Sequence, residues 1–201
     1  MTVHDFTHGI PAGWNTYDSK RVCRSNVVAE DEAVSLWTRP YGQEWRGGSL
    51  IWPEPFTYGS VTVVMRADKG RWTKALLMLW PAYEWPPEID FLEMGGALNW
   101  DRHKIAVTAH YDQDNKMIHR SITADMTQWA TVSVSWTPEL IIVSHEDEDG
   151  PATPVVMVNP GIDNPMKVHM TYWPTHKAAS DPWPVASSRM QVRWVSIEGG
   201  T

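Results

Sequence analysis

Short segments of alternating apolar and polar residues, separated by turn-forming residues, extend over almost the whole chain. The 201 residues include 15 Pro and 13 Gly, and no amphipathic helical stretch of any length interrupts the pattern. Two segments, Ser25–Glu30 and Ala33–Thr38, are predicted to form a hairpin around an acidic turn. The other predicted strands are Gly48–Trp52, Val61–Ala67, Lys74–Trp80, Glu88–Glu93, Lys104–Tyr111, Lys116–Thr123, Ala130–Trp136, Leu140–Glu146, Pro154–Val158, Lys167–Trp173 and Gln191–Glu198.

Roughly a dozen short strands must bury their apolar faces against one another, so the pattern predicts an all-β sandwich or jelly roll. The segment Lys74–Trp80 is almost continuously apolar, which predicts a strand buried on both faces. A chain of 201 residues is ample for one domain and short for two. Because no linker or internal repeat divides it, we expect a single domain over residues 1–201.

One predicted strand carries three acids among large apolar residues, in the sequence W-P-P-E-I-D-F-L-E at residues 85–93. Side chains alternate along a regular strand, so Glu88 and Asp90 point to the same face. Glu93 is five positions from Glu88, and a flat strand would send it to the other face. A β-bulge around Phe91-Leu92 would return it. The sequence therefore predicts three carboxylates in a row on one face of one strand.

Such a row has a chemical use. Crowded carboxylates cannot all ionise, so at least one pKa rises, and a proton donor then lies beside an anion. Retaining glycosidases need that combination, with the two carboxyl groups about 5–5.5 Å apart across the scissile bond. An exposed acidic strand face is the simpler interpretation of the three acids taken alone.

The acidic strand resembles the active-site strand of glycoside hydrolase family 16, whose bulged motif reads E-[I/V]-D-[F/I]-x-E and usually follows a Trp- and Pro-rich loop. Four other stretches resemble landmarks of that family in the same order: Phe56–Val63, Arg66–Trp72, Val132–Glu139 and Met190–Ile197. The resemblance implies a concanavalin-like β-sandwich whose concave sheet forms a substrate cleft.

The resemblance also implies the roles of the acids. Glu88 would be the nucleophile, Glu93 the general acid/base and Asp90 the helper between them, in a retaining endo-β-glycosidase that uses double displacement. His110 falls where the family often has a histidine on the next strand, so we expect it near the acids. The expected substrate is a neutral or lightly charged polysaccharide of the β-1,3-glucan or β-galactan type, because an acidic cleft repels strongly anionic chains.

Aromatic side chains are the candidates for contact with sugar rings. The chain has 13 Trp, more than one core requires, and aromatic rings can stack on the apolar faces of sugars without any charge. The candidates are Trp85, Trp173, Trp72, Trp80, Trp45 and Tyr172.

The chain departs from the family pattern at two places. Its strand before the motif lacks the usual floor Trp, which is replaced by a Leu or displaced to Trp80. Many family members bind a structural calcium through an Asp of the closing strand, and that position is Arg193 here. We therefore expect no such calcium site, and we expect neither a metal nor another cofactor.

Composition excludes several other partners. The net charge is −7 and basic residues do not cluster, which argues against nucleic acid and anionic membranes. The single Cys23 excludes an internal disulfide and a Cys-based zinc site. No apolar run approaches the ~20 residues of a membrane span. No signal peptide is visible at the N-terminus, which leaves open a mature or excised domain or a component of a virion. We expect an extracellular or virion-associated protein, and a monomer as an isolated domain.

Two further functions compete with the hydrolase. The same sandwich could be a non-catalytic, lectin-like carbohydrate-binding domain, although a lectin has no need for three desolvated acids. It could also be a virion or cell-surface attachment module.

Overall fold

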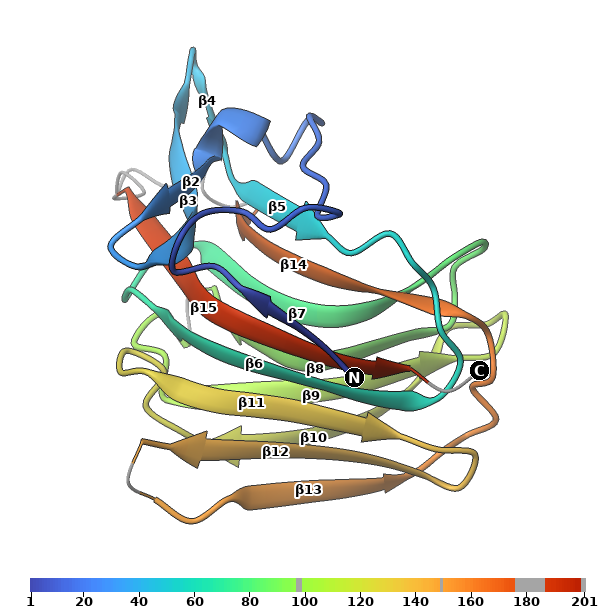
Figure 1. Cartoon of the computed structure of the whole chain (residues 1–201). Coiled ribbons are helices and arrows are strands. Elements are labelled where there is room, and N and C mark those ends of the chain that lie inside the picture. The colour runs from blue at the N-terminus through green and yellow to red at the C-terminus, as the bar shows by residue number, and fades with distance from the viewer. Residues whose placement is uncertain (97–98, 149, 176–186, 200–201) are drawn as a thin grey trace.

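A computed structural model describes residues 1–96, 99–148, 150–175 and 187–199. These residues form two antiparallel sheets packed face to face, as Figure 1 shows. The larger sheet runs, in spatial order, through β13 (Thr153–Val158), β12 (Leu140–Asp147), β11 (Ala130–Trp136), β6 (Gly59–Ala67), β15 (Ser188–Gly199), β3 (Ala33–Tyr41) and β2 (Val27–Glu30), with β1 (Thr2–Asp5) on β15 and β4 (Glu44–Arg46) on β3.

The smaller sheet carries the acidic strand. Its order is β10 (Lys116–Thr123), β9 (Lys104–Tyr111), β8 (Glu88–Gly95), β7 (Thr73–Pro81), β14 (Met166–Pro174) and β5 (Gly48–Ile51). A 3-10 turn, Arg24–Asn26, precedes β2. The predicted all-β sandwich of jelly-roll type is confirmed.

Alternating side chains build the core between the sheets. On β6 the inward residues are Val61, Val63, Met65 and Ala67, all at most 1% exposed. The central strand β7 contributes Ala75, Leu77 and Leu79 to the same core. Its alternate residues, Leu76 and Met78, are also buried but lie on the opposite face of the sheet. The prediction that this strand is buried on both faces is therefore confirmed.

The predicted hairpin is present as β2 and β3, with Glu30 paired to Ala33. Its two turn residues, Asp31 and Glu32, both have φ of 52°. Two central residues with positive φ match the right-handed twist of the flanking strands. The sequence analysis did not predict β1 or β4.

A buried arginine holds the end of the acidic strand in place. Arg102 is 0% exposed, and its guanidinium donates to four backbone carbonyl oxygens, those of Asp68, Gly70, Thr73 and Met94. It also donates to the Tyr172 hydroxyl at 2.9 Å. These bonds connect the start of β7, the end of β8 and the end of β14, so one side chain fixes three neighbouring strands.

We expect Arg102→Met to lower the free energy of unfolding by about 3 kcal/mol, because several buried carbonyls lose their donor at once. Urea unfolding followed by tryptophan fluorescence measures the change. The matched control is Arg120→Met, since Arg120 is exposed and donates only to the carbonyl of the preceding residue. A loss of stability in Arg102→Met no larger than in the control would contradict this role.

Candidate active site

The acidic strand contains the predicted bulge. In the pairing of β8 with β9, Asp90 lies opposite Thr108 and Glu93 opposite Ala106, so two residues of β8 face one residue of β9. The two residues of the bulge, Phe91 and Leu92, are both 0% exposed and belong to the core. The bulge therefore places Glu88, Asp90 and Glu93 together on the face of the smaller sheet that points away from the core.

Glu88 and Asp90 form a buried carboxyl pair, 7% and 3% exposed. The indole N–H of Trp85 donates to Glu88 Oε2 at 2.6 Å. Burial, with the neighbouring Asp90 charge as the second cause, raises the pKa of Glu88 to about 8. Asp90 Oδ1 is buried and has no hydrogen-bond partner among the described residues. Glu88 therefore holds a proton at neutral pH.

His110 lies beside Asp90, as the sequence predicted. Its Nε2 is 3.4 Å from Asp90 Oδ2, and its Nδ1 donates to Asn115 Oδ1 at 2.8 Å. The hydrogen bond to Asp90 is the main cause that raises the pKa of His110 to about 9. His110 is therefore a cation at neutral pH and balances the charge of Asp90.

A lysine lies beside the third acid. Lys74 on β7 forms an ion pair with Glu93 on β8, and both side chains are partly buried. The sequence analysis did not identify Lys74 as a site residue. It shares the face of Leu76 and Met78, so strand alternation could have placed it on the cleft floor.

Three of the aromatic candidates lie on or next to this face. Trp85 is 45% exposed and bonds Glu88. Trp80 is 38% exposed. Leu79 of β7 pairs with Ile89 of the antiparallel strand β8, so the next residue of β7, Trp80, lies beside the preceding residue of β8, Glu88. Trp173 pairs with Lys74 in the β-ladder, and the Arg21 guanidinium lies 5.4 Å from the centre of its ring.

The other three candidates are placed differently. Trp72 is half-buried in the turn that leads into β7, with φ of 63°, and Trp45 is half-buried on the β3–β4 hairpin opposite Pro40. Sugar contact by either of them stays a prediction. The prediction for Tyr172 is wrong, because its side chain is 0% exposed and points into the core.

The Tyr172 hydroxyl has a structural partner set instead. It accepts from Arg102 and bonds Thr73 Oγ1 and Ser188 Oγ at 2.9 and 2.8 Å. Tyr172 and Trp173 are adjacent on one strand, so only one of them can face the cleft.

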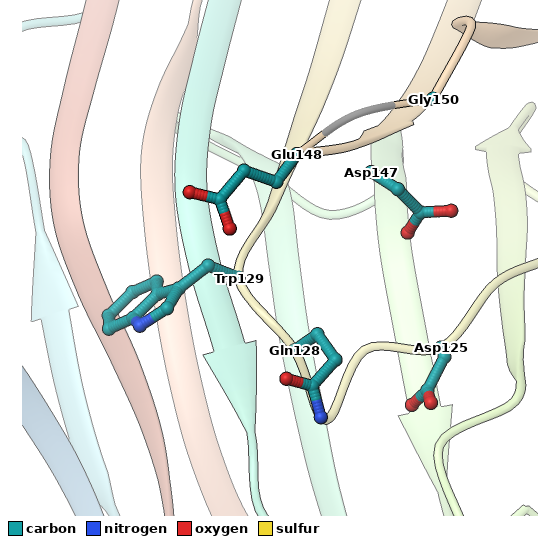
Figure 2. Close-up of a pocket in the computed structure, with 6 residues that line it drawn as sticks. All are labelled: Asp125, Gln128, Trp129, Asp147, Glu148 and Gly150. Atoms are coloured by element: carbon teal, nitrogen blue, oxygen red, sulfur yellow. The ribbon is translucent and has the colours of Figure 1, made fainter.

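Another hollow of about 380 Å³ lies outside the cleft, on loops at one end of the sandwich (Figure 2). Three carboxylates line it, but they point in different directions, and Asp125 is held by Thr127. Within the described ranges, no three His, Cys, Asp or Glu side chains are grouped as ligands for a metal ion. Arg193 stacks at 4.0 Å over Trp129, one of the residues that line this hollow.

No helix in the described part of the chain has the length and apolar character needed to cross a membrane.

Comparison with known proteins agrees with the geometry of the site. The family model for glycosyl hydrolases family 16 matches residues 17–196. The chain therefore belongs to glycosyl hydrolases family 16, and it is a glycoside hydrolase. A search of curated protein sequences found no matching relative.

Solved structures with the same fold include several glucanases. An endo-1,3-β-glucanase (laminarinase) catalytic domain from Thermotoga petrophila matches with a TM-score of 0.81 at 15% identity, covering 100% of this chain and 98% of that chain. A laminarinase from Rhodothermus marinus matches at 0.80 and 17%, covering 99% and 96%. A Bacteroides ovatus family 16 enzyme from a mixed-linkage glucan locus, in complex with a product, matches at 0.80 and 14%, covering 98% and 99%.

The protonation states of the site make stability depend on pH. Between the ordinary pKa of 4.5 and the folded value of about 8, Glu88 binds more proton in the folded protein than in the unfolded one. The raised pKa of His110 contributes fully to the free energy of unfolding below pH 6.5, and this contribution is lost as pH rises through about 9. The lowered pKa of the buried His169 acts in the opposite direction below pH 6.5, so we expect the free energy of unfolding to fall as pH rises from about 6.5 to about 9.

Asp90→Asn should flatten that slope, because it removes the main cause of the raised His110 pKa. Proton NMR titration of the His110 ring should show a pKa below about 9, while urea unfolding at several pH values gives the slope. Asp112→Asn is the control, since Asp112 is exposed and pairs with Lys116. A His110 titration that is identical in Asp90→Asn and wild type would refute the assignment.

Proposed function

We propose that this protein is a retaining endo-β-glycosidase that hydrolyses a polysaccharide of the β-1,3-glucan or β-galactan type. The observation that carries the proposal is the bulge in β8, which puts Glu88 and Glu93 on the same open face of the sheet. The similar structures favour the glucan, since they are laminarinases and a mixed-linkage glucanase. We also propose that the protein acts outside the cell or on a virion.

In the first step Glu93, which has taken up a proton from the solvent, donates that proton to the leaving glycosidic oxygen while Glu88 attacks the anomeric carbon. Glu88 must be an anion at that moment. The proton that Glu88 holds at rest can pass to the neighbouring Asp90, to which Glu88 is hydrogen-bonded, and this leaves the negative charge on Glu88. The Trp85 indole N–H then stabilises the attacking carboxylate and keeps it in position.

In the second step Glu93 is an anion and removes a proton from a water molecule, which displaces Glu88 from the anomeric carbon with retained configuration. The Lys74 ammonium balances the charge of Glu93 at this stage. Trp80, Trp85 and Trp173 are the proposed contacts for the neighbouring sugar units.

We expect Glu88→Gln to reduce reducing-sugar release to background on a panel of laminarin, lichenan, agarose, carrageenan and galactan, because the amide cannot form the covalent intermediate. Proton NMR of the first product of the wild-type enzyme should show the β-anomer. Glu139→Gln, an exposed acid on the turn after β11, is the matched control and should keep full activity. Binding of a panel glycan without cleavage by wild type would favour the lectin-like alternative.

Glu93→Gln should separate the two acids by their roles. Loss of proton donation lowers the rate on a polysaccharide by about 10²–10⁴. Nitrophenolate leaves without being protonated, so on a β-aryl glycoside with this leaving group the rate of the glycosylation step in Glu93→Gln should fall much less. Pre-steady-state release of nitrophenol measures that step, and an equal loss on both substrates would contradict the acid role of Glu93.

A further inference from the structure

A cavity of about 440 Å³ opens at one end of the cleft face. Lys167 and His169 of β14 contribute to its lining from the sheet, and Tyr83 and Trp80 contribute from the end of β7 and the loop that follows. The segment Asn15–Tyr17 lines another side, because Asn15 pairs with Ile51 at the edge of β5. Chain segments far apart in the sequence therefore build this cavity together.

The cavity is next to the nucleophile. Trp80 lies in its lining and, on the neighbouring strand, beside Glu88. Lys167 pairs with Trp80 in the β-ladder, one strand further from Glu88. A glycan that crosses the sheet at Glu88 therefore reaches the cavity within a unit or two.

The lining of the cavity has an unusual charge for this protein. The chain carries 24 Asp and Glu against 17 Lys and Arg. Nevertheless none of the described residues that line the cavity is an acid, and Lys167 is the one cation among them. Within the described part of the chain, no carboxylate forms an ion pair with Lys167.

The other titratable group of the cavity does not add charge. His169 bonds Ser49 Oγ at 2.6 Å and lies 3.4 Å from the Tyr17 hydroxyl. Burial lowers its pKa to about 4, so it is neutral at physiological pH. His169 therefore acts as a fixed polar part of the lining, and the positive charge comes from Lys167.

We propose that this cavity is a subsite for a sugar unit that carries a carboxylate or sulfate group, with Lys167 as its ionic contact. This inference rests on the proposed function and narrows its substrate class. Trp80 and the 81% exposed Tyr83 supply apolar surface for the ring of the same unit. A neutral sugar unit would displace water from the Lys167 ammonium group without offering it an anionic partner. Removing water from an unpaired charge is unfavourable.

The test compares three glycans with one backbone: laminarin, laminarin oxidised at C6 to glucuronate units, and laminarin sulfate. We expect kcat/KM on one of the charged forms to exceed that on laminarin by about tenfold. Preference for the oxidised form identifies a uronate, and preference for the sulfated form identifies a sulfate ester. The preference should weaken between 0.05 and 0.5 M NaCl, since salt screens the ionic contact.

The variants separate the ionic contact from general effects of charge. Lys167→Met should abolish the preference and leave the rate on laminarin within about twofold, while Lys167→Arg should keep the preference. Lys104→Met is the matched control, because Lys104 is an exposed lysine of the same sheet outside the cavity. Equal rates on charged and neutral glycans, or a loss in Lys167→Met that is the same on both, would overturn the proposal.

The experiment also distinguishes failure of the subsite from failure of the enzymatic function. If wild type cleaves none of the three glycans, the proposed hydrolysis of a β-1,3-glucan fails, and calorimetric binding of the same glycans decides the inference. Salt-sensitive binding of a charged form that is lost in Lys167→Met supports the subsite. Absence of binding to any of the three, or equal binding to all of them, refutes it.

Discussion

The bulge in β8 is the constraint on which the site depends. Without it, Glu93 would point between the sheets, where an unpaired charge is too unfavourable to persist. The bulge persists because both of its residues, Phe91 and Leu92, have large apolar side chains buried in the core. Their burial contributes about 1.5–3 kcal/mol each, enough to offset the interrupted ladder. Packing between the sheets thus sets the position of a functional acid on the outer face, and Arg102 fixes the strand just beyond it.

The site contains three acids but carries little net charge at rest. Glu88 holds a proton, His110 balances Asp90, and Lys74 balances Glu93. This arrangement changes the expectation that an acidic cleft repels anionic glycans, because that expectation counted the acids and left out their partners. Because His110 and Lys74 balance the two anions, the catalytic acids do not by themselves decide whether a charged or a neutral glycan binds. Groups further along the cleft therefore determine that preference. Lys167 is such a group, and it has no carboxylate partner among the described residues.

The sequence was sufficient for the features that follow from alternation. It predicted the sandwich, the row of acids and the bulge, because each depends on which side of a strand a residue occupies. The same rule could have excluded Tyr172, which is adjacent to Trp173, and could have found Lys74. Alternation alone could not show that His110 lies opposite Glu88, since that depends on the register between two strands, and only the family resemblance placed His110 near the acids. Nor could it place Asn15–Tyr17 beside β5, because that segment has no period and makes a single bridge.

The replacement of the floor tryptophan explains why the end cavity matters. Leu76 pairs with Glu93 on one side and Thr171 on the other, so it occupies the middle of the cleft floor with a side chain smaller than tryptophan. The nearest large aromatic ring on the same face of β7 is Trp80, four residues further along, beside Glu88 and the cavity. On β7 itself, the aromatic surface of this face therefore lies at the nucleophile end of the site. In the proposed subsite, the apolar surface of Trp80 and the charge of Lys167 act together at this end, since the two residues pair in the β-ladder.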